Sequence, residues 1–462
     1  VSKANILAKL SQDIDKKYTI KEKDKFSDKL VSDIYIKAEE IAKKNVEVES
    51  KKEKEFGEKV DNILTSKYLG FPIMLLLLGG IFWLTIVGAN YPSALLAEVL
   101  FWVEGYLSNF LIILSFPQWL HDMMVLGVYR TLAWVVSVML PPMAIFFPIF
   151  TLLEDLGYLP RVAFNLDNFF KKAGAHGKQS LTMSMGFGCN AAGVIAARII
   201  DSPREKLIAI LTNNFVPCNG RFPTLIILAS LFISSVFAPP YNSFIAAAVV
   251  VGIVLIGITI TLIISWGLSK TLLKGVPSSF SLELPPYRKP RIINVLVRSF
   301  IDRTLFVLSK AVMVAAPAGV FVWLFANTSI GDLSLINYVS NLLDPFAVLI
   351  GLDGFILLAF ILGLPANEIV IPIIVMSYLS AGAMLEPESG NVLKDILVNN
   401  GWTWVTALAT MLFSLLHFPC GTTLLTIKKE TNSFKWTFLA FVIPTAIAII
   451  VNFIVVQLIY LF

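Results

Sequence analysis

Long apolar segments alternate with short polar loops through most of this 462-residue sequence. A bilayer requires about 20 consecutive apolar residues for each helical crossing. Segments of this length predict membrane-spanning helices near residues 70–90, 126–153, 207–236, 243–268, 305–326, 343–363, 403–426 and 437–461. Two further apolar segments, 180–200 and 366–380, are interrupted. We therefore expect an all-α, polytopic membrane protein.

The first 67 residues follow a different pattern, in which lysine and glutamate mix with apolar residues at helical spacing. The stretch "SDKLVSDIYIKAEEIAKK" is an example, and it predicts a small soluble helical domain with solvated charged faces. Residues 93–118 contain Glu98, Glu104 and several aromatic side chains. This mixture predicts an amphipathic segment that lies at the membrane interface.

The composition excludes an ordinary soluble protein, because 56% of the residues are hydrophobic and only 15% are charged. The formal net charge of +5 is small, and the basic residues lie between apolar spans, so we expect no nucleic-acid partner. Residues 1–20 lack the apolar core of a signal peptide. The chain begins with Val1 rather than methionine, from which we expect a fragment of a longer protein.

Lysine and arginine accumulate in cytoplasmic loops of membrane proteins and therefore predict orientation. Basic residues mark as cytoplasmic the N-terminal domain and the loops at 161–178, 202–206, 285–303 and 428–435. Loops with few or no basic residues, which we assign to the external side, are 237–242, 327–340 and 383–401. Segment 180–200 begins and ends at cytoplasmic loops, so it must enter the membrane and return. By the same counting, 343–380 enters from the external side and is broken at "GLPANE".

Two parts of the chain then contain the same order of elements in opposite directions: a span, a broken element, a Pro-Cys span and a final span. This is an inverted-topology repeat, in which sites form near the bilayer midplane. The pairs "GFGCN" with "GLPAN" and "FVPC" with "HFPC" support it. The predicted domains are a cytoplasmic helical domain at 1–67, a first transmembrane helix and interfacial segment at 68–125, a first repeat at 126–270, a basic linker at 271–304 and a second repeat at 305–462.

All three cysteines, Cys189, Cys218 and Cys420, lie at predicted helix breaks inside apolar segments. Their odd number does not indicate a disulfide framework. A bound metal lowers the pKa of a thiol and makes it a soft anionic ligand. The alternative is a small buried hydrophobic residue. The breaks favour a ligand role for Cys189 and Cys218, whereas the two interpretations are equally supported for Cys420.

Amide side chains accompany the cysteines. Asn190 follows Cys189, and Asn367 occupies the paired position in the second repeat. Amide oxygen, imidazole and thiolate ligands together suit a first-row divalent cation better than magnesium or calcium. Asn214 lies near Cys218, where it either lines a path or joins helices by hydrogen bonds.

Two ionisable groups extend this set. A carboxylate at the bilayer centre costs on the order of 3 kcal/mol, so Glu368 is expected either to act on a cation or to have a partner, for which Arg221 is the candidate. His417 precedes Cys420 by three residues and shares its helix face only if the helix continues through Pro419. Both Glu368 and His417 are candidate auxiliary ligands.

At these residues the sequence resembles the membrane part of the FeoB-type ferrous iron transporters. The matching motifs are "LEDLGYLPRVAFNLD" at 153–167, "GFGCN" at 186–190, "PCNGR" at 217–221, "LGLPANEIVIP" at 362–372 and "HFPCGTTLLTIKKETNSFKWT" at 417–437. The resemblance covers the chain from about residue 68 to its end, and residues 1–67 resemble the spacer that follows the family's GTP-binding domain. It implies two Gate motifs whose cysteines, here Cys189, Cys218 and Cys420, pass Fe2+.

The resemblance also implies partners and a location: a bacterial cytoplasmic membrane with its lipids, a GTP-binding domain in cis or in trans, small Feo accessory proteins and a homo-oligomer. GTP and Mg2+ belong to that separate domain, because the sequence contains no G-x-x-x-x-G-K-[ST] motif, and we expect no enzymatic activity of this chain itself. Ala191 and Ala192 replace the Val-Pro of many family members, so the shape of the first break differs from theirs.

The sequence therefore predicts a conduit for ferrous iron into the cytoplasm, gated by the GTP-binding domain. One alternative is a carrier of another divalent metal or of a nucleoside-like solute. A nucleoside site would require aromatic and amide groups rather than thiols. A second alternative is a membrane sensor or scaffold, which has little need of two opposed broken elements.

Overall fold

The computed structural model describes residues 20–45, 51–66, 68–234, 241–274, 287, 292–331, 333–385 and 390–461. These residues are almost wholly helical, and their β-structure is a single short hairpin of β1 (Ser329–Ile330) and β2 (Leu333–Ser334). Six helical segments in the described part are long and apolar enough to cross a membrane: 70–113, 118–155, 245–270, 307–327, 404–431 and 434–461. The predicted all-α, polytopic membrane fold is confirmed.

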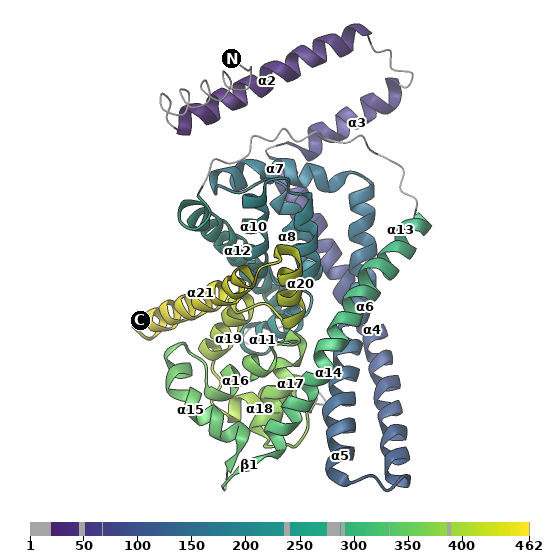
Figure 1. Ribbon diagram of the computed structural model, residues 1–462, viewed down its shortest axis with the longest axis vertical. Helices are drawn as coiled ribbons and strands as arrows, with labels where there is room; N and C mark the ends of the chain where they lie inside the picture. The colour runs from purple at the N-terminus through teal and green to yellow at the C-terminus, as the bar shows by residue number, and fades with distance from the viewer. Residues whose placement is uncertain are drawn as a thin grey trace, which may run out of the picture.

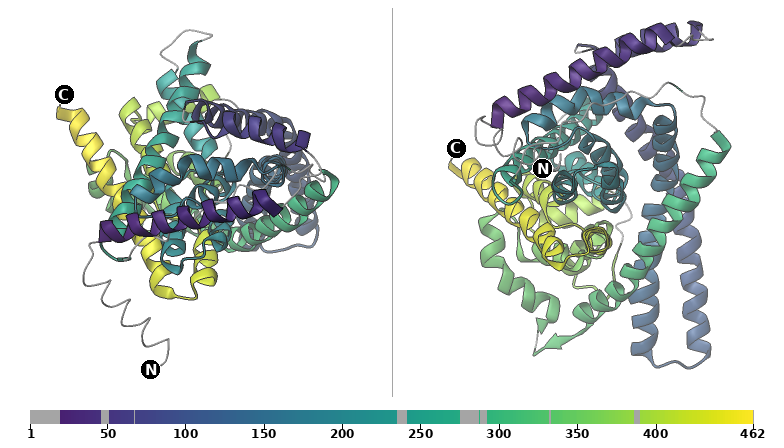
Figure 2. Two further views of the ribbon diagram at one scale, coloured as in Figure 1. Left: turned by 90° about the horizontal axis from the view of Figure 1, so that it is seen from above. Right: turned by 45° about the horizontal axis from the view of Figure 1, so that its top comes forward.

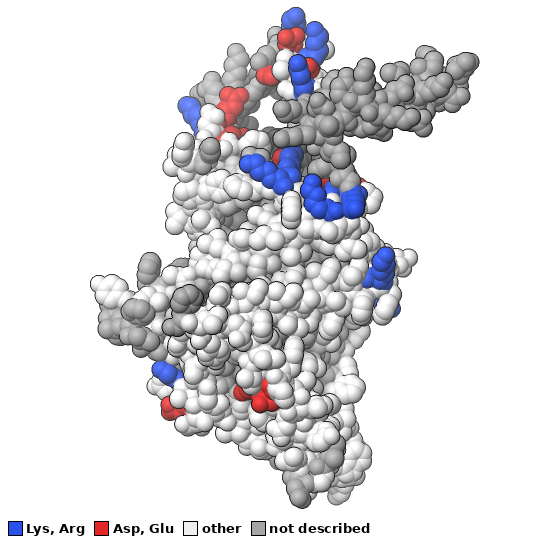
Figure 3. Space-filling view, turned by 90° about the vertical axis from the view of Figure 1, so that its left-hand side faces the viewer, with Lys and Arg blue, Asp and Glu red and all other residues white. Residues whose placement is uncertain are grey.

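The N-terminal part is helical, as expected. It consists of α2 (Ile20–Asn45) and α3 (Lys51–Leu64). Figures 1 and 2 show α2 lying across one end of the molecule. On the face drawn in Figure 3, lysine and arginine side chains gather near this end, and a wide, largely uncharged band follows. Such a band is what a lipid-facing surface requires.

A long helical hairpin follows. It consists of α4 (Gly70–Ile113), α5 (Gln118–Asp122), the π-helix η1 (Met123–Tyr129) and α6 (Arg130–Asp155). Residues 93–113, expected as a separate interfacial segment, continue α4 without a break. Arg130 donates two hydrogen bonds to the Glu104 carboxylate, with Nε 3.1 Å and Nη2 2.5 Å from Oε1. This largely buried ion pair joins α4 to α6, which explains why Glu104 lies on an otherwise apolar helix.

The first repeat continues with a series of mostly short helices and ends in one long helix. They are α7 (Tyr158–Lys172), α8 (Gln179–Gly188), α9 (Asn190–Ala196), the 3-10 turn η2 (Ala197–Ile199), α10 (Pro203–Thr212), the 3-10 turn η3 (Asn213–Phe215), α11 (Phe222–Leu228), the π-helix η4 (Ala229–Ile233) and the long helix α12 (Tyr241–Lys270). The predicted continuous span at 207–236 is therefore wrong. The chain leaves the helix between Phe215 and Phe222, where Pro217 has no amide hydrogen to donate.

The second repeat repeats this plan. Helix α13 (Ile292–Arg298) and the π-helix η6 (Ser299–Leu305) precede it, and it contains α14 (Phe306–Asn327), α15 (Leu335–Leu349), α16 (Gly354–Leu362), the 3-10 turn η7 (Asn367–Ile369), α17 (Val370–Tyr378), α18 (Gly390–Asn399), α19 (Trp404–Leu416), α20 (Gly421–Thr431) and α21 (Phe434–Leu461). Helices α15 and α16 are bent by 109° at their junction. Of the predicted linker at 271–304, residues 275–286 and 288–291 lie outside the described residues, and 292–304 are helical.

The two broken elements lie toward opposite ends of the molecule. Figure 1 shows α8 toward the end that carries α2 and α3, and α16 with α17 toward the other end. Between them lie α11, α19 and α20. The cysteine-bearing breaks thus meet in the interior, where two clusters of buried apolar side chains surround them.

Candidate functional site

The first break lies between α8 and α9. Cys189 has an extended backbone, with φ −158° and ψ 127°, and α9 begins immediately at Asn190. Gly188 is required here, because a Cβ at this position would lie 2.6 Å from the Phe146 ring. The glycine therefore lets the broken backbone approach α6 closely.

The second break has the same local form. Ala366 has φ −152° and ψ 118°, and the 3-10 turn η7 begins at the next residue, Asn367. An extended residue followed by an asparagine at a helix start thus occurs in both repeats, as the pairing of "GFGCN" with "GLPAN" predicts. Asn190 and Asn367 are both buried.

Each break contacts the Pro-Cys break of its own repeat through the backbone. The amide of Asn219, after Cys218, donates to the Gly188 carbonyl at 3.4 Å. The amide of Gly421, after Cys420, donates to the Leu364 carbonyl at 2.7 Å. These hydrogen bonds pair backbone groups that have no partner within a helix, and the irregular backbone is therefore stable inside the protein.

Arg221 joins the two repeats. Its side chain is fully buried and donates to the carbonyl oxygens of Asn214 and Leu415 through Nη1 at 2.7 and 2.8 Å. Through Nη2 it reaches Asn214 Oδ1 at 3.1 Å and the carbonyl oxygens of His417 and Phe418 at 3.2 and 3.1 Å. The guanidinium therefore binds the free carbonyl groups at the end of α19.

The alternative in which Arg221 is the partner of Glu368 is not found among the described ion pairs, because the guanidinium is occupied by carbonyl groups. Glu368 lies in the interior, and a Cβ added at Gly220 would overlap its carboxylate. Its backbone carbonyl accepts from Trp134 Nε1 at 3.3 Å. Glu368 also interacts electrostatically with the thiols of Cys218 and Cys420.

The three cysteines come together from three different breaks. Cys189 and Cys218 are each 8% exposed, Cys420 is partly buried, and the three thiols are within electrostatic range of one another. Asn367 Nδ2 lies 4.0 Å from the Cys218 sulfur. Among the described residues, no group of three or more His, Cys, Asp or Glu side chains is arranged to hold a metal ion. The thiols are therefore neighbours without forming a closed metal cage.

His417 does not share a helix face with Cys420, because α19 ends at Leu416 and α20 begins at Gly421. Its Nδ1 contacts the carbonyl oxygens of Phe413 and Ser414 at 3.0 and 2.9 Å, which places the ring proton on Nδ1. Nε2 is buried without a hydrogen-bond partner. The imidazole is thus oriented with a free acceptor nitrogen.

The remaining predicted amide, Asn214, donates to the His417 carbonyl at 2.5 Å and contacts Asn190 Nδ2 at 3.3 Å. It therefore joins the two repeats by hydrogen bonds. Sequence reasoning missed Thr423, whose Oγ1 lies 3.2 Å from the Cys420 sulfur. A hydroxyl residue one helical turn after the cysteine was the available signal.

Comparison with known proteins agrees with this arrangement. A family described as "Nucleoside recognition" matches residues 136–232 and 308–434, and one described as "Ferrous iron transport protein B C terminus" matches residues 250–302. The Fe(2+) transporter FeoB of Staphylococcus aureus (strain MSSA476) is 31% identical over 421 residues, which cover 88% of this chain. This chain has a FeoB-type membrane region. No solved structure matches it.

Other relatives extend the comparison. The Fe(2+) transporter FeoB of Campylobacter jejuni is 27% identical, over 90% of this chain and 67% of that protein. A Porphyromonas gingivalis protein described as a fusion of Fe(2+) transport protein A and Fe(2+) transporter FeoB is 26% identical, over 88% of this chain and 52% of that protein. The chain spans about 60% of the length of the S. aureus relative. The eight predicted site residues of the FeoB-type region all lie within the ranges matched as "Nucleoside recognition".

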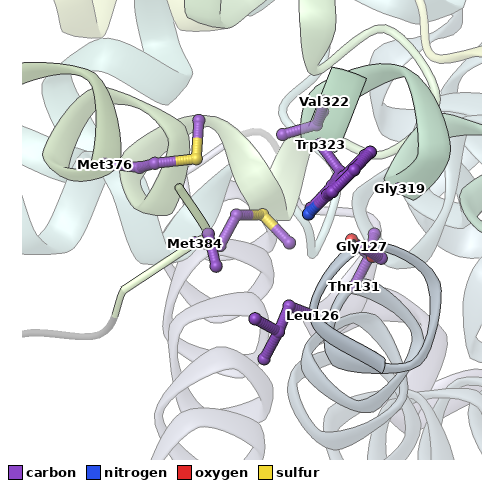
Figure 4. Close-up of a pocket in the computed structure, with 9 residues that line it drawn as sticks. Leu126, Gly127, Thr131, Gly319, Val322, Trp323, Met376 and Met384 are labelled. Carbon is purple, nitrogen blue, oxygen red and sulfur yellow. Dashed lines mark hydrogen bonds between the residues drawn. The ribbon is translucent and has the colours of Figure 1, made fainter. Parts of the chain in front are cut away.

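A small pocket of the FeoB-type region lies apart from the cysteines, between η1, α14 and α17. Gly127 and Gly319 let η1 and α14 approach closely beside it, because a Cβ at Gly127 would lie 2.9 Å from Trp323. Figure 4 shows Met384 pointing toward the Trp323 ring, with Met376 farther from it across the pocket. The pocket contains none of the predicted ligands and has an apolar lining.

Proposed function

We propose that the chain forms a path for ferrous iron across a bacterial cytoplasmic membrane into the cell, and that the N-terminal helices face the cytoplasm. The observation that carries this proposal is the convergence of Cys189, Cys218 and Cys420 from three separate helix breaks. Relatives described as Fe(2+) transporters over 88 to 90% of this chain support the choice of metal.

In this proposal the cysteine thiols bind Fe2+ transiently as thiolates, since this borderline metal accepts sulfur and nitrogen ligands. Glu368 supplies a further negative charge beside Cys218 and Cys420. The free Nε2 of His417 and the amide oxygens of Asn190 and Asn367 are auxiliary ligands. Asn214 serves mainly to hold the two repeats together, through its bond to the His417 carbonyl.

In the same proposal, transport is regulated by protein domains other than the one that contains these ligand residues. A GTP-binding domain, in cis or in trans and with its own Mg2+, acts through the helices of residues 1–67, so that this chain transports without itself being an enzyme. The P. gingivalis fusion protein supports association with an accessory protein of the transport protein A type. A homo-oligomer in the membrane is part of the same proposal.

Uptake of radioactive ferrous iron by cells that express the full-length protein tests the ligand roles. Cys189→Ser and Cys218→Ser should each reduce uptake at least about tenfold, because an alcohol is a much poorer ligand for Fe2+ than a thiolate. Ala191→Ser is the matched control, since it adds the same hydroxyl two residues away and removes no thiol. Wild-type uptake in both cysteine variants would exclude the ligand role. Competition by Mn2+ or Zn2+ identifies a carrier of another metal.

A further inference from the structure

A buried ion pair connects the N-terminal helices to the membrane part. Arg161 of α7 is 2% exposed and donates to both carboxylate oxygens of Asp61 of α3, through Nε at 2.9 Å and Nη2 at 3.1 Å. Its Nη1 donates to the Gly157 carbonyl at 2.9 Å. Gly157 has φ +83° and forms the turn between α6 and α7. Arg161 therefore fixes Asp61 and the start of α7 with one side chain.

Tyr287 completes this contact from the segment between the two repeats. The Arg161 guanidinium lies 4.3 Å above the centre of the Tyr287 ring, and the Tyr287 hydroxyl donates to Asp61 Oδ1 at 2.7 Å. Close by, Asn165 Nδ2 donates to the Leu64 carbonyl at the end of α3 at 2.8 Å. We name Asp61, Arg161, Asn165 and Tyr287 the α3–α7 junction.

The charges at the junction favour its closed form. Burial raises the pKa of the Asp61 carboxyl, but the hydrogen bonds from Arg161 and Tyr287 outweigh it and hold this pKa below its usual value. Burial and the hydrogen bond to Asp61 raise the pKa of Tyr287 to about 12. Asp61 is thus ionised and Tyr287 protonated at neutral pH, as the bidentate contact requires.

Helix α7 leads directly from the junction to the first break. It ends at Lys172, and after a short turn the chain enters α8, which packs against α7 and ends at the residue before Cys189. Gly174 in the turn has φ +70°, and a Cβ there would overlap Ser269 of α12. Helix α7 is thus fixed at its start by Arg161 and at its end by this close packing.

We propose that Arg161 is a positioning residue that couples α3 to the break at Cys189. When α3 moves, Asp61 moves with it, and the ion pair with Arg161 transmits this movement to α7. Helix α7 then displaces α8 and the backbone at Cys189. The proposal rests on the proposed function only in treating Cys189 as part of the transport path. The coupling itself is a property of the protein without iron.

The rate at which N-ethylmaleimide modifies Cys189 tests the coupling without iron. The full-length protein is placed in lipid nanodiscs, and the modification of each cysteine is quantified by mass spectrometry. Asp61→Asn and Arg161→Ala should each increase the rate at Cys189 about tenfold, because the break opens more often once the ion pair is lost. Tyr287→Phe removes one hydrogen bond and should give a smaller increase.

Two controls separate coupling from general loss of structure. Lys171→Ala removes another basic side chain of α7, whose ion pair among the described residues is with Asp167 on the same helix, and should leave the Cys189 rate unchanged. Cys420 lies in the second repeat and should keep its wild-type rate in every variant. Combining Asp61→Asn with Arg161→Ala should add little to either change, since both remove the same contact.

A wild-type Cys189 rate in Asp61→Asn and Arg161→Ala overturns the proposal, and so do equal increases at Cys189 and Cys420. If Arg161→Ala does not fold, the Cys189 modification rates of Asp61→Asn and Tyr287→Phe test the proposal in its place. Because no iron is present, loss of iron uptake in the cysteine variants and loss of coupling here are separate results.

Discussion

Removal of the Arg221 guanidinium should weaken the contact between the two repeats. In Arg221→Met, the Asn214 amide still donates to the His417 carbonyl, but the carbonyl groups of Asn214, Leu415 and Phe418 lose the guanidinium as a donor. Each unsatisfied buried group costs about 1–3 kcal/mol, or roughly 6 kcal/mol for three. Removing a buried charge returns several kcal/mol of desolvation energy, so the net loss of unfolding free energy is about 3 kcal/mol.

Thermal unfolding in nanodiscs, followed by tryptophan fluorescence, measures this loss. Arg221→Met should lower the midpoint by roughly 5 °C or more. Arg221→Lys keeps the charge but replaces the planar fork with a single ammonium group, so it should recover only part of the loss. Arg198→Met is the matched control: the Arg198 side chain is 60% exposed, although its partner Glu430 is only 5% exposed, so its loss should cost less than loss of the fully buried Arg221 contacts. Equal midpoints for Arg221→Met and Arg198→Met would refute the reasoning.

Three further predictions concern stability. Gly188→Ala should lower the unfolding free energy by about 1–3 kcal/mol in a denaturant titration, because the new methyl group meets the Phe146 ring; an unchanged value would contradict the close packing. Glu104→Gln should cost about 2 kcal/mol by removing the charge opposite a partly buried arginine on α6, whereas Glu98→Gln, at an exposed position of the same helix, should be neutral. Burial lowers the pKa of His176 below its usual 6.5, despite nearby carboxylates. As the pH decreases, His176 therefore becomes protonated in the unfolded chain at a higher pH than in the folded protein. Unfolding free energy should therefore fall as pH decreases below about 6.5, and less so in His176→Asn, as pH-dependent unfolding curves would measure.

The helix breaks could be predicted from the sequence because their causes are local. Glycine, proline and asparagine weaken helical hydrogen bonding within an apolar segment, although α6 continues through Pro141, Pro142 and Pro148. The extended backbone at Cys189 and at Ala366 agrees with the pairing of two five-residue motifs. The span predicted at 207–236 was wrong as one continuous helix, because the chain leaves the helix between Phe215 and Phe222, around Pro217.

Side-chain partners could not be predicted in the same way. Charge alone made Arg221 a candidate partner of Glu368, but the guanidinium binds carbonyl groups at the end of α19, nearly 200 residues further along the chain. Those carbonyl groups are free only because α19 ends at Leu416. The same break separates His417 from the helix face of Cys420.

By itself, the sequence determined the membrane class of this protein, the places where its helices break and the residue types at those breaks, since hydrophobicity and backbone preference are properties of neighbouring residues. Only the tertiary structure decided that three thiols from separate breaks are neighbours, that Arg221 joins the two repeats, and that Asp61, Arg161 and Tyr287 meet. These contacts depend on how distant helices pack, because each buried polar group takes whichever partner the packing brings within hydrogen-bond distance.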